Sequence, residues 1–129
     1  MIKQRYGKII NISSIAGLTG FANTLPYISS KHGIMGMTKA LAVELAPYKI
    51  NVNTICPGPV KTPMFDESIE KTGQTLEEGT VSWLGSTVFN ELLYPEDIAN
   101  AVLWFASDVS HMVTGQYLSV SGGWMGILP

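Results

Sequence analysis

Three short apolar runs along the chain predict β-strands. The first, Gly7–Ser14, opens with a glycine and continues as Lys-Ile-Ile-Asn-Ile. This nearly unbroken β-branched stretch is typical of a central parallel strand that is covered on both faces. Ile50–Cys56 predicts a second strand, which ends at Pro57-Gly-Pro, and Gln116–Val120 predicts a third, which ends at Ser121-Gly-Gly.

Two helices are predicted between these strands. Pro26 suits the first turn of a helix that runs to about Ala46, and its apolar residues lie on several faces, so we expect burial against more than one neighbour. Pro95-Glu-Asp starts another helix with a proline and two carboxylates at the positive end of the helix dipole. Its predicted inward stripe consists of Ile98, Ala101, Val102 and Phe105. Strands and helices that alternate in this way predict an α/β fold with a parallel sheet.

The segment between the second strand and the second helix has no clear period. Residues 62–94 combine turn glycines with scattered apolar side chains, which predicts short helical pieces. Long irregular segments inside compact domains are usually functional lids or linkers. We therefore expect residues 62–94 to form a substrate-binding lid, here called the lid segment.

Composition narrows the function classes. The chain has 129 residues, of which 46% are apolar and 14% charged, which describes one domain or part of one. The net charge of −2, without a basic cluster, argues against a nucleic-acid or anionic-membrane partner. No apolar run reaches the roughly 20 residues of a membrane helix, and the single Cys56 cannot form an internal disulfide, so we expect a cytoplasmic protein. Neither His32 nor His111 has a metal-ligand partner at workable spacing, so we expect no metal site.

Chemistry-bearing residues gather at the predicted carboxyl ends of the strands. Tyr27 and Lys31 are four residues apart on a predicted helix, so their side chains share a face. Alone, such a pair can be an ordinary exposed helix pair. However, Ser13 and Ser14 end the first strand, and Pro57–Thr62 leaves the second strand at the same edge, where α/β folds place ligand sites.

Seven consecutive motifs resemble the short-chain dehydrogenase/reductase family, in the family's order and spacing and nearly from end to end. They are Asn11-Ile-Ser-Ser-Ile-Ala-Gly17, Tyr27-Ile-Ser-Ser-Lys31-His-Gly, Leu45-Ala-Pro, Ile50-Asn-Val-Asn53, Pro57-Gly-Pro-Val-Lys-Thr-Pro63, Pro95-Glu-Asp-Ile-Ala99 and Thr114-Gly with Ser121-Gly-Gly123. The resemblance implies the C-terminal half of a doubly wound, parallel-sheet Rossmann fold.

The family's Gly-rich turn, T-G-x-x-x-G-x-G, does not occur in the sequence, and neither does its Asn-Ala-Gly segment. We therefore expect residues 1–129 to be a partial NAD(P)-binding domain from which the N-terminal, Gly-rich cofactor half is absent. A gene fragment and a misassigned start both remain open. The residue that separates NAD from NADP would lie in the same missing half, so the resemblance implies either cofactor without choosing one.

The resemblance also implies roles for individual residues. Tyr27 would be the catalytic acid/base, Lys31 its partner, and Ser14 the group that holds the substrate oxygen. Ser14 is preferred to Ser13 because its spacing to Tyr27 matches the family better, and Ser13 would face the other side of the strand. The cofactor-binding residues implied are Ile12, Tyr27, Lys31, Pro57, Gly58, Val60 and Thr62, and the substrate-binding residues are Ser14, Tyr27, Met64 and Phe65.

The activity implied is NAD(P)-dependent interconversion of a secondary alcohol and a ketone by hydride transfer. A free tyrosine, with a pKa of about 10, is too weak a base at neutral pH. One ammonium about 4 Å away supplies the roughly 4 kcal/mol that brings such a phenol to about 7. The apolar lid segment favours a lipophilic alcohol or ketone, unless its side chains only pack it onto the body. The family also implies a homodimer or homotetramer. The alternative is a truncated, non-catalytic fragment that acts only through association.

Overall fold

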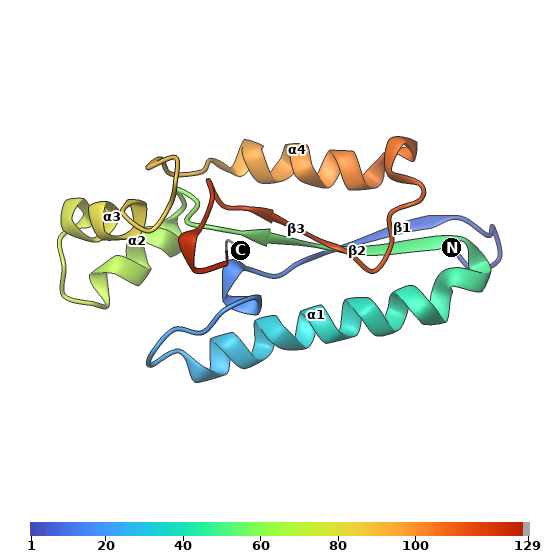
Figure 1. Ribbon diagram of the computed structural model, residues 1–129, viewed down its shortest axis with the longest axis horizontal. Coiled ribbons are helices and arrows are strands. Elements are labelled where there is room, and N and C mark those ends of the chain that lie inside the picture. Colours follow the sequence, from blue (N-terminus) through green and yellow to red (C-terminus); the bar gives the residue numbers. More distant parts are fainter. Residues whose placement is uncertain (128–129) are drawn as a thin grey trace.

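The computed structural model describes residues 1–127, and its centre is a three-stranded parallel sheet. The strands are β1 (Gly7–Ile12), β2 (Ile50–Pro57) and β3 (Tyr117–Val120), in the order β1-β2-β3. Helix α1 (Leu25–Leu45) covers one face of the sheet and α4 (Pro95–Ala106) covers the other (Figure 1). The predicted α/β class and parallel sheet are confirmed.

Strand β2, rather than β1, is the central strand of this sheet. Val52, Ile55 and Cys56 of β2 have no exposed surface, whereas β1 pairs only with β2 and its Ile12 is 43% exposed. The prediction of a central strand is therefore wrong for β1 in residues 1–127, where β1 lies at the edge of the sheet, although α1 and α4 both contact it. The β-branched composition of β1 suits a buried strand, but no described strand pairs with its other edge.

Helix α1 packs on the sheet along one face. Thr38 and Ala42 are its buried residues, and Ala42 joins Ile50 and Val52 of β2 in a small apolar core. Two of its apolar side chains, Leu25 and Val43, are 75% and 78% exposed. The expected burial against more than one neighbour is confined to one face of the helix, where α1 contacts β1, β2 and the 3-10 turn at Ile15–Gly17. Only one face can meet a sheet that lies on one side of it.

A buried polar group fixes α1 against the two strands beneath it. The Thr38 hydroxyl donates to the Ile34 carbonyl of its own helix at 2.8 Å. It accepts hydrogen bonds from the Asn11 amide of β1 at 2.9 Å and from the Thr54 hydroxyl of β2 at 2.6 Å. Because a hydroxyl has one donor hydrogen and two lone pairs, Thr38 is fully satisfied. These bonds set the position of the helix along the strands.

Helix α4 presents the predicted inward stripe. Phe105 is 1% exposed, and Ile98, Ala101 and Val102 are half-buried. The helix begins where Pro95 suggested, and the backbone N–H of Tyr94 donates to the Asp97 carboxylate at 2.7 Å. This bond satisfies one donor just before the first turn of the helix, as acidic capping residues do.

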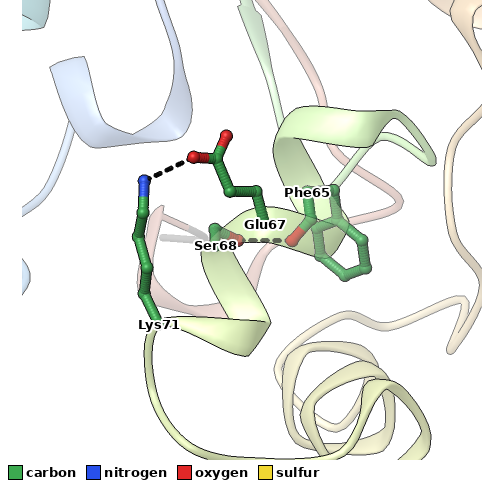
Figure 2. Close-up of polar contacts among 4 residues, drawn as sticks. All are labelled: Phe65, Glu67, Ser68 and Lys71. Carbon is green, nitrogen blue, oxygen red and sulfur yellow. Dashed lines mark hydrogen bonds and ion pairs between the residues drawn. The ribbon is translucent and has the colours of Figure 1, made fainter.

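The lid segment contains two short helices, α2 (Pro63–Glu70) and α3 (Leu76–Leu84), which lie beyond the carboxyl ends of the strands (Figure 1). In α2, Glu67 pairs with Lys71 at 2.9 Å and the Ser68 hydroxyl donates to the Phe65 carbonyl at 2.6 Å (Figure 2). The hydrogen bond from Lys71 holds the pKa of Glu67 below its ordinary value. Both pairs are local to α2, so the helix is stabilised from within its own sequence.

Candidate active site

The two serines after β1 have different surroundings. Ser13 is buried, its N–H extends the sheet by donating to the Ile55 carbonyl at 2.8 Å, and its hydroxyl donates to the Lys31 carbonyl at 2.9 Å. Ser14 is half-buried and is the N-cap of a 3-10 turn, where its Oγ accepts from the Ala16 N–H at 3.1 Å. That bond uses a lone pair of Ser14 and not its hydrogen, which leaves the hydroxyl able to donate to a ligand.

Tyr27 and Lys31 meet on the face of α1 that borders the end of β1. The Lys31 Nζ lies 5.5 Å from the centroid of the Tyr27 ring and donates to the Ile12 carbonyl at 3.4 Å. Tyr27 is 46% exposed and Lys31 is half-buried. The only ion pair described within residues 1–127 joins Glu67 and Lys71, so no carboxylate neutralises the Lys31 ammonium there.

Cys56, near the end of β2, lies beside the two serines that follow β1. Its thiol is fully buried, it interacts with Ser13 and Ser14, and its Sγ lies 3.7 Å from the Met35 Sδ of α1. Burial raises the pKa of the thiol from 9.0 to about 11, against smaller opposing effects of the two serines and of Lys31. Cys56 is therefore uncharged at neutral pH and packs in this corner as a small apolar residue.

The turn after β2 follows directly from Cys56. The Gly58 N–H donates to the Val120 carbonyl at 2.9 Å, and a Cβ on Gly58 would lie 2.8 Å from the Ser121 Cα. Gly58 thus allows the turn to approach the end of β3. The Thr62 Oγ1 donates to the Val60 carbonyl at 3.2 Å and accepts from the Phe65 N–H at 3.3 Å, which caps α2.

The two expected substrate residues of the lid segment differ in exposure. Met64 is 73% exposed, whereas Phe65 is 8% exposed and packs edge-on against Trp83 at a centroid distance of 6.4 Å. The contacts described for residues 1–127 do not join either residue to Tyr27 or Lys31. In the structure, Ile12, Ser13 and Tyr27 each contact Lys31. Cys56 interacts with Ser13. Met64 and Phe65 lie apart from these residues, on the lid segment.

An aromatic cluster that the sequence analysis missed attaches the lid segment to the body. Trp83 lies 6.0 Å from Phe21 and 5.4 Å from Trp124, and Phe21 lies 5.8 Å from Trp124, all between ring centroids. Phe21 belongs to the loop that follows Ser14, and Trp124 follows β3. These residues are far apart in the sequence and share no period, so no sequence pattern could have grouped them.

Other features of the described residues lie away from this corner. A hollow of about 500 Å³ lies between α4 and the end of β3, and Tyr27 and Lys31 are not among its lining residues. Within residues 1–127, no group of three or more His, Cys, Asp or Glu side chains is arranged to hold a metal ion. None of the helices described there has both the length and the apolar surface needed to cross a membrane.

Residues 1–125 match the family model described as enoyl-(acyl carrier protein) reductase. The chain is 46% identical over 123 residues to the Thauera aromatica (2S)-((R)-hydroxy(phenyl)methyl)succinyl-CoA dehydrogenase subunit BbsD, covering 95% of this chain and 46% of that protein. It is 41% identical over 123 residues to the Thermotoga maritima 3-oxoacyl-(acyl-carrier-protein) reductase, covering 95% of this chain and 47% of that protein. The chain thus spans about half the length of the curated relatives that it matches.

Solved structures match with the same coverage. A variant of the actinorhodin polyketide ketoreductase with NADPH has a TM-score of 0.90 and 35% identity, covering 96% of this chain and 49% of that one. An NAD+-bound xylitol dehydrogenase has a TM-score of 0.90 and 31% identity, covering 95% of this chain and 51% of that one. The three-stranded sheet with its helices therefore corresponds to half of a larger Rossmann-type domain in these neighbours.

Proposed function

The chain belongs to the short-chain dehydrogenase/reductase family, and from this premise we propose that residues 1–129 carry the catalytic half of an oxidoreductase. The proposed reaction interconverts a secondary alcohol and a ketone with NAD(H) or NADP(H). Tyr27 is the proposed acid/base, Lys31 its cationic partner, and Ser14 the donor that holds the substrate oxygen.

The observation that supports this proposal best is the pairing of Tyr27 with an unneutralised Lys31. The ammonium lies over the tyrosine ring and beside the Ile12 carbonyl at the carboxyl end of β1. A cation at such a distance stabilises a phenolate, and burial of one side of the pair strengthens the interaction.

In the reducing direction, the Tyr27 hydroxyl gives its proton to the carbonyl oxygen, while the carbonyl carbon receives a hydride and becomes the alcohol carbon. The Ser14 hydroxyl donates a hydrogen bond to the same oxygen and orients it, and Lys31 stabilises the phenolate that remains on Tyr27. In the oxidising direction, Tyr27 takes the alcohol proton back. The bound nicotinamide supplies or accepts the hydride.

The donor set at this corner fits the nicotinamide end of a dinucleotide. The Lys31 ammonium has three N–H donors, of which one is directed at Ile12, so two are available for the Tyr27 oxygen and a ribose hydroxyl. Ile12, Pro57, Gly58, Val60 and Thr62 are the other residues proposed to hold that end. The sequence contains no T-G-x-x-x-G-x-G turn, so the contacts proposed here are limited to the nicotinamide end.

For the substrate, we propose a ketone or secondary alcohol with an apolar substituent, next to the lid segment at residues 62–94. Two relatives are named for acyl thioesters that carry an oxo or a hydroxyl group, so 3-oxoacyl thioesters are the first compounds to test. Met64 and Phe89 are both 73% exposed on the lid segment and could face such a substituent. Trp83 packs the lid segment onto Phe21 and Trp124, and Phe65 packs against Trp83, which supports the structural alternative for those two residues.

We further propose that the complete enzyme is a cytoplasmic homodimer or homotetramer that associates through the exposed face of α1. Val43 and Met37 are exposed there, and no atom lies within 4 Å of a Cβ built on Gly33 or Gly36. A small apolar helix face of this kind permits close approach of a second helix. The competing hypothesis, a non-catalytic fragment that acts only by association, shares this surface but needs no Tyr27 hydroxyl.

A chimera distinguishes these hypotheses. The N-terminal half of the Thermotoga maritima reductase is joined to residue 1 of this chain, and consumption of NADPH or NADH is followed with 3-oxoacyl thioesters, cyclic ketones and small polyols. We expect turnover that disappears in the Tyr27→Phe variant. A folded chimera that binds the dinucleotide but shows no turnover, or one in which Tyr27→Phe keeps more than a tenth of kcat, would contradict the proposal.

A further inference from the structure

The Ser13 hydroxyl forms a hydrogen bond that joins the end of β1 to α1. This buried hydroxyl donates to the main-chain carbonyl of Lys31, so the end of β1 is joined directly to the second turn of α1. At the other end of the same residue, the Lys31 ammonium donates to the carbonyl of Ile12, the neighbour of Ser13. Lys31 is therefore held at its backbone and at its side-chain tip by two consecutive residues of β1 and its extension.

The space around this bond is closed on the side of the 3-10 turn. A Cβ on Gly17 would collide with the Ser13 Oγ and would lie 2.9 Å from the Lys31 carbonyl oxygen. On the side of β2, the Cys56 thiol interacts with Ser13. The absence of a side chain at Gly17 leaves the space that the Ser13 hydroxyl occupies when it bonds to the Lys31 carbonyl.

We propose that Ser13 is a positioning residue for Lys31. Its hydroxyl fixes the α1 backbone at Lys31 against β1, so that the ammonium stays beside the Ile12 carbonyl and over the Tyr27 ring. The catalytic consequence rests on the proposed function, whereas the positioning itself does not. Ser14 remains the serine proposed to touch substrate, and Ser13 acts only through Lys31.

Few neighbouring groups hold the Lys31 ammonium in place. Tyr27 faces it from α1, and the uncharged Cys56 faces it from β2. No described carboxylate pairs with the ammonium to hold it in place. Its position therefore depends on the hydrogen bond to Ile12, which is long at 3.4 Å, and on the position of its own backbone.

The first test measures the accessibility of the Lys31 amine without any need for activity. A short pulse of a water-soluble acylating reagent is applied to the dilute full chain, and labelling of Lys31 is divided by that of the exposed Lys39 on the same helix. We expect Ser13→Ala to raise this ratio about fivefold, the factor that one ordinary hydrogen bond supplies. We expect Gly17→Ala, which leaves Ser13 in place but displaces its hydroxyl, to raise the ratio as well.

Ser30→Ala is the matched control, because the Ser30 hydroxyl also donates to a carbonyl of α1, that of Tyr27 at 2.7 Å, but without joining the helix to β1. It should leave the labelling ratio unchanged. An unchanged ratio in Ser13→Ala, or an equal rise at both lysines, would show that Ser13 only contributes to general stability and would overturn the proposal.

The second test uses the chimera. Ser13→Ala should lower kcat about fivefold, with little change in the KM of the ketone, because Lys31 acts on Tyr27. A higher KM with an unchanged kcat would contradict it. If Tyr27→Phe remains active, the proposed function fails, and the labelling ratio still decides the role of Ser13.

Discussion

The ammonium of Lys31 lies 5.5 Å from the centre of the Tyr27 ring, one turn further along α1. Residues four apart on a helix face the same way, so the sequence alone predicted that these side chains could meet. The structure adds the reason why Lys31 stays there, since the Ile12 carbonyl receives one of its hydrogens. Four predictions concern this corner and the elements around it, and a fifth concerns the outer face of α1.

Removal of the Tyr27 hydroxyl should lower the rate of catalysis and leave the stability of the fold nearly unchanged. In the chimera, Tyr27→Phe should lower kcat at least a hundredfold, the usual contribution of a positioned acid/base. The free energy of unfolding should change by less than about 0.5 kcal/mol, as for other exposed substitutions, because Tyr27 is 46% exposed. Steady-state kinetics and urea unfolding measure both quantities.

Lys31→Ala should lower kcat and also raise the KM of the dinucleotide, because the proposed roles of Lys31 include both Tyr27 and the ribose. Lys39→Ala, on the exposed side of the same helix, is its control and should change neither. A Lys31→Ala variant with the dinucleotide KM of the parent would remove the ribose contact from the proposal.

The buried thiol should make stability fall at alkaline pH. The folded chain holds the Cys56 proton more tightly than the unfolded chain does, since burial raises the pKa from 9.0 to about 11. The stabilisation is therefore complete below pH 9 and is lost as the pH rises towards 11, by about 2–3 kcal/mol in total. Urea unfolding of the parent and of Cys56→Ala between pH 7.5 and 10.5 should show a gap that narrows with pH. A constant gap would mean that the thiol ionises equally well in both states.

The aromatic cluster should control the attachment of the lid segment. Trp83→Ala removes ring contacts to Phe21, Phe65 and Trp124. We expect protease cleavage within residues 62–94 to become faster, while cleavage elsewhere changes little, because these contacts join the lid segment to the body. Trp104→Ala, on the outer side of α4, is the control. Equal acceleration in both variants would show that Trp83 stabilises the whole fold rather than the lid segment.

Association should depend on the exposed face of α1. Gly36→Arg adds a long charged side chain where no atom lies within 4 Å, so the fold of one chain should tolerate it apart from the ordinary cost of a changed helix residue. Light scattering of the chimera at micromolar concentration should give a dimer or tetramer for the parent and a smaller species for Gly36→Arg. Glu70→Arg on α2 is the control. A monomeric parent would contradict the proposed assembly.

Local signals in the sequence predicted much of this fold. Pro26 and Pro95 each lie in the first turn of a helix, and the stripe that ends at Phe105 is the buried face of α4. These features depend on residues close together in the sequence, where backbone restrictions and helical periodicity act directly.

The errors arose where the outcome depends on distant residues. The composition of β1 predicted a central strand, but a central position requires a paired strand on each edge, and only β2 is described beside β1. No local pattern predicted the bond from Ser13 to the Lys31 carbonyl, because this bond depends on how α1 packs on the sheet. The grouping of Phe21 with Trp83 likewise follows from tertiary packing and leaves no local pattern.

The contact between Trp83 and Trp124 also provides an intrinsic spectroscopic probe of the lid segment. The two indole rings are 5.4 Å apart and inclined at 42°. Electronic transitions of chromophores this close couple, so the pair should give a paired positive and negative band in ultraviolet circular dichroism that neither tryptophan gives alone. Trp83 belongs to α3 and Trp124 to the chain after β3. The band would therefore vanish when the two segments part, and the opening of residues 62–94 could be timed without any added dye.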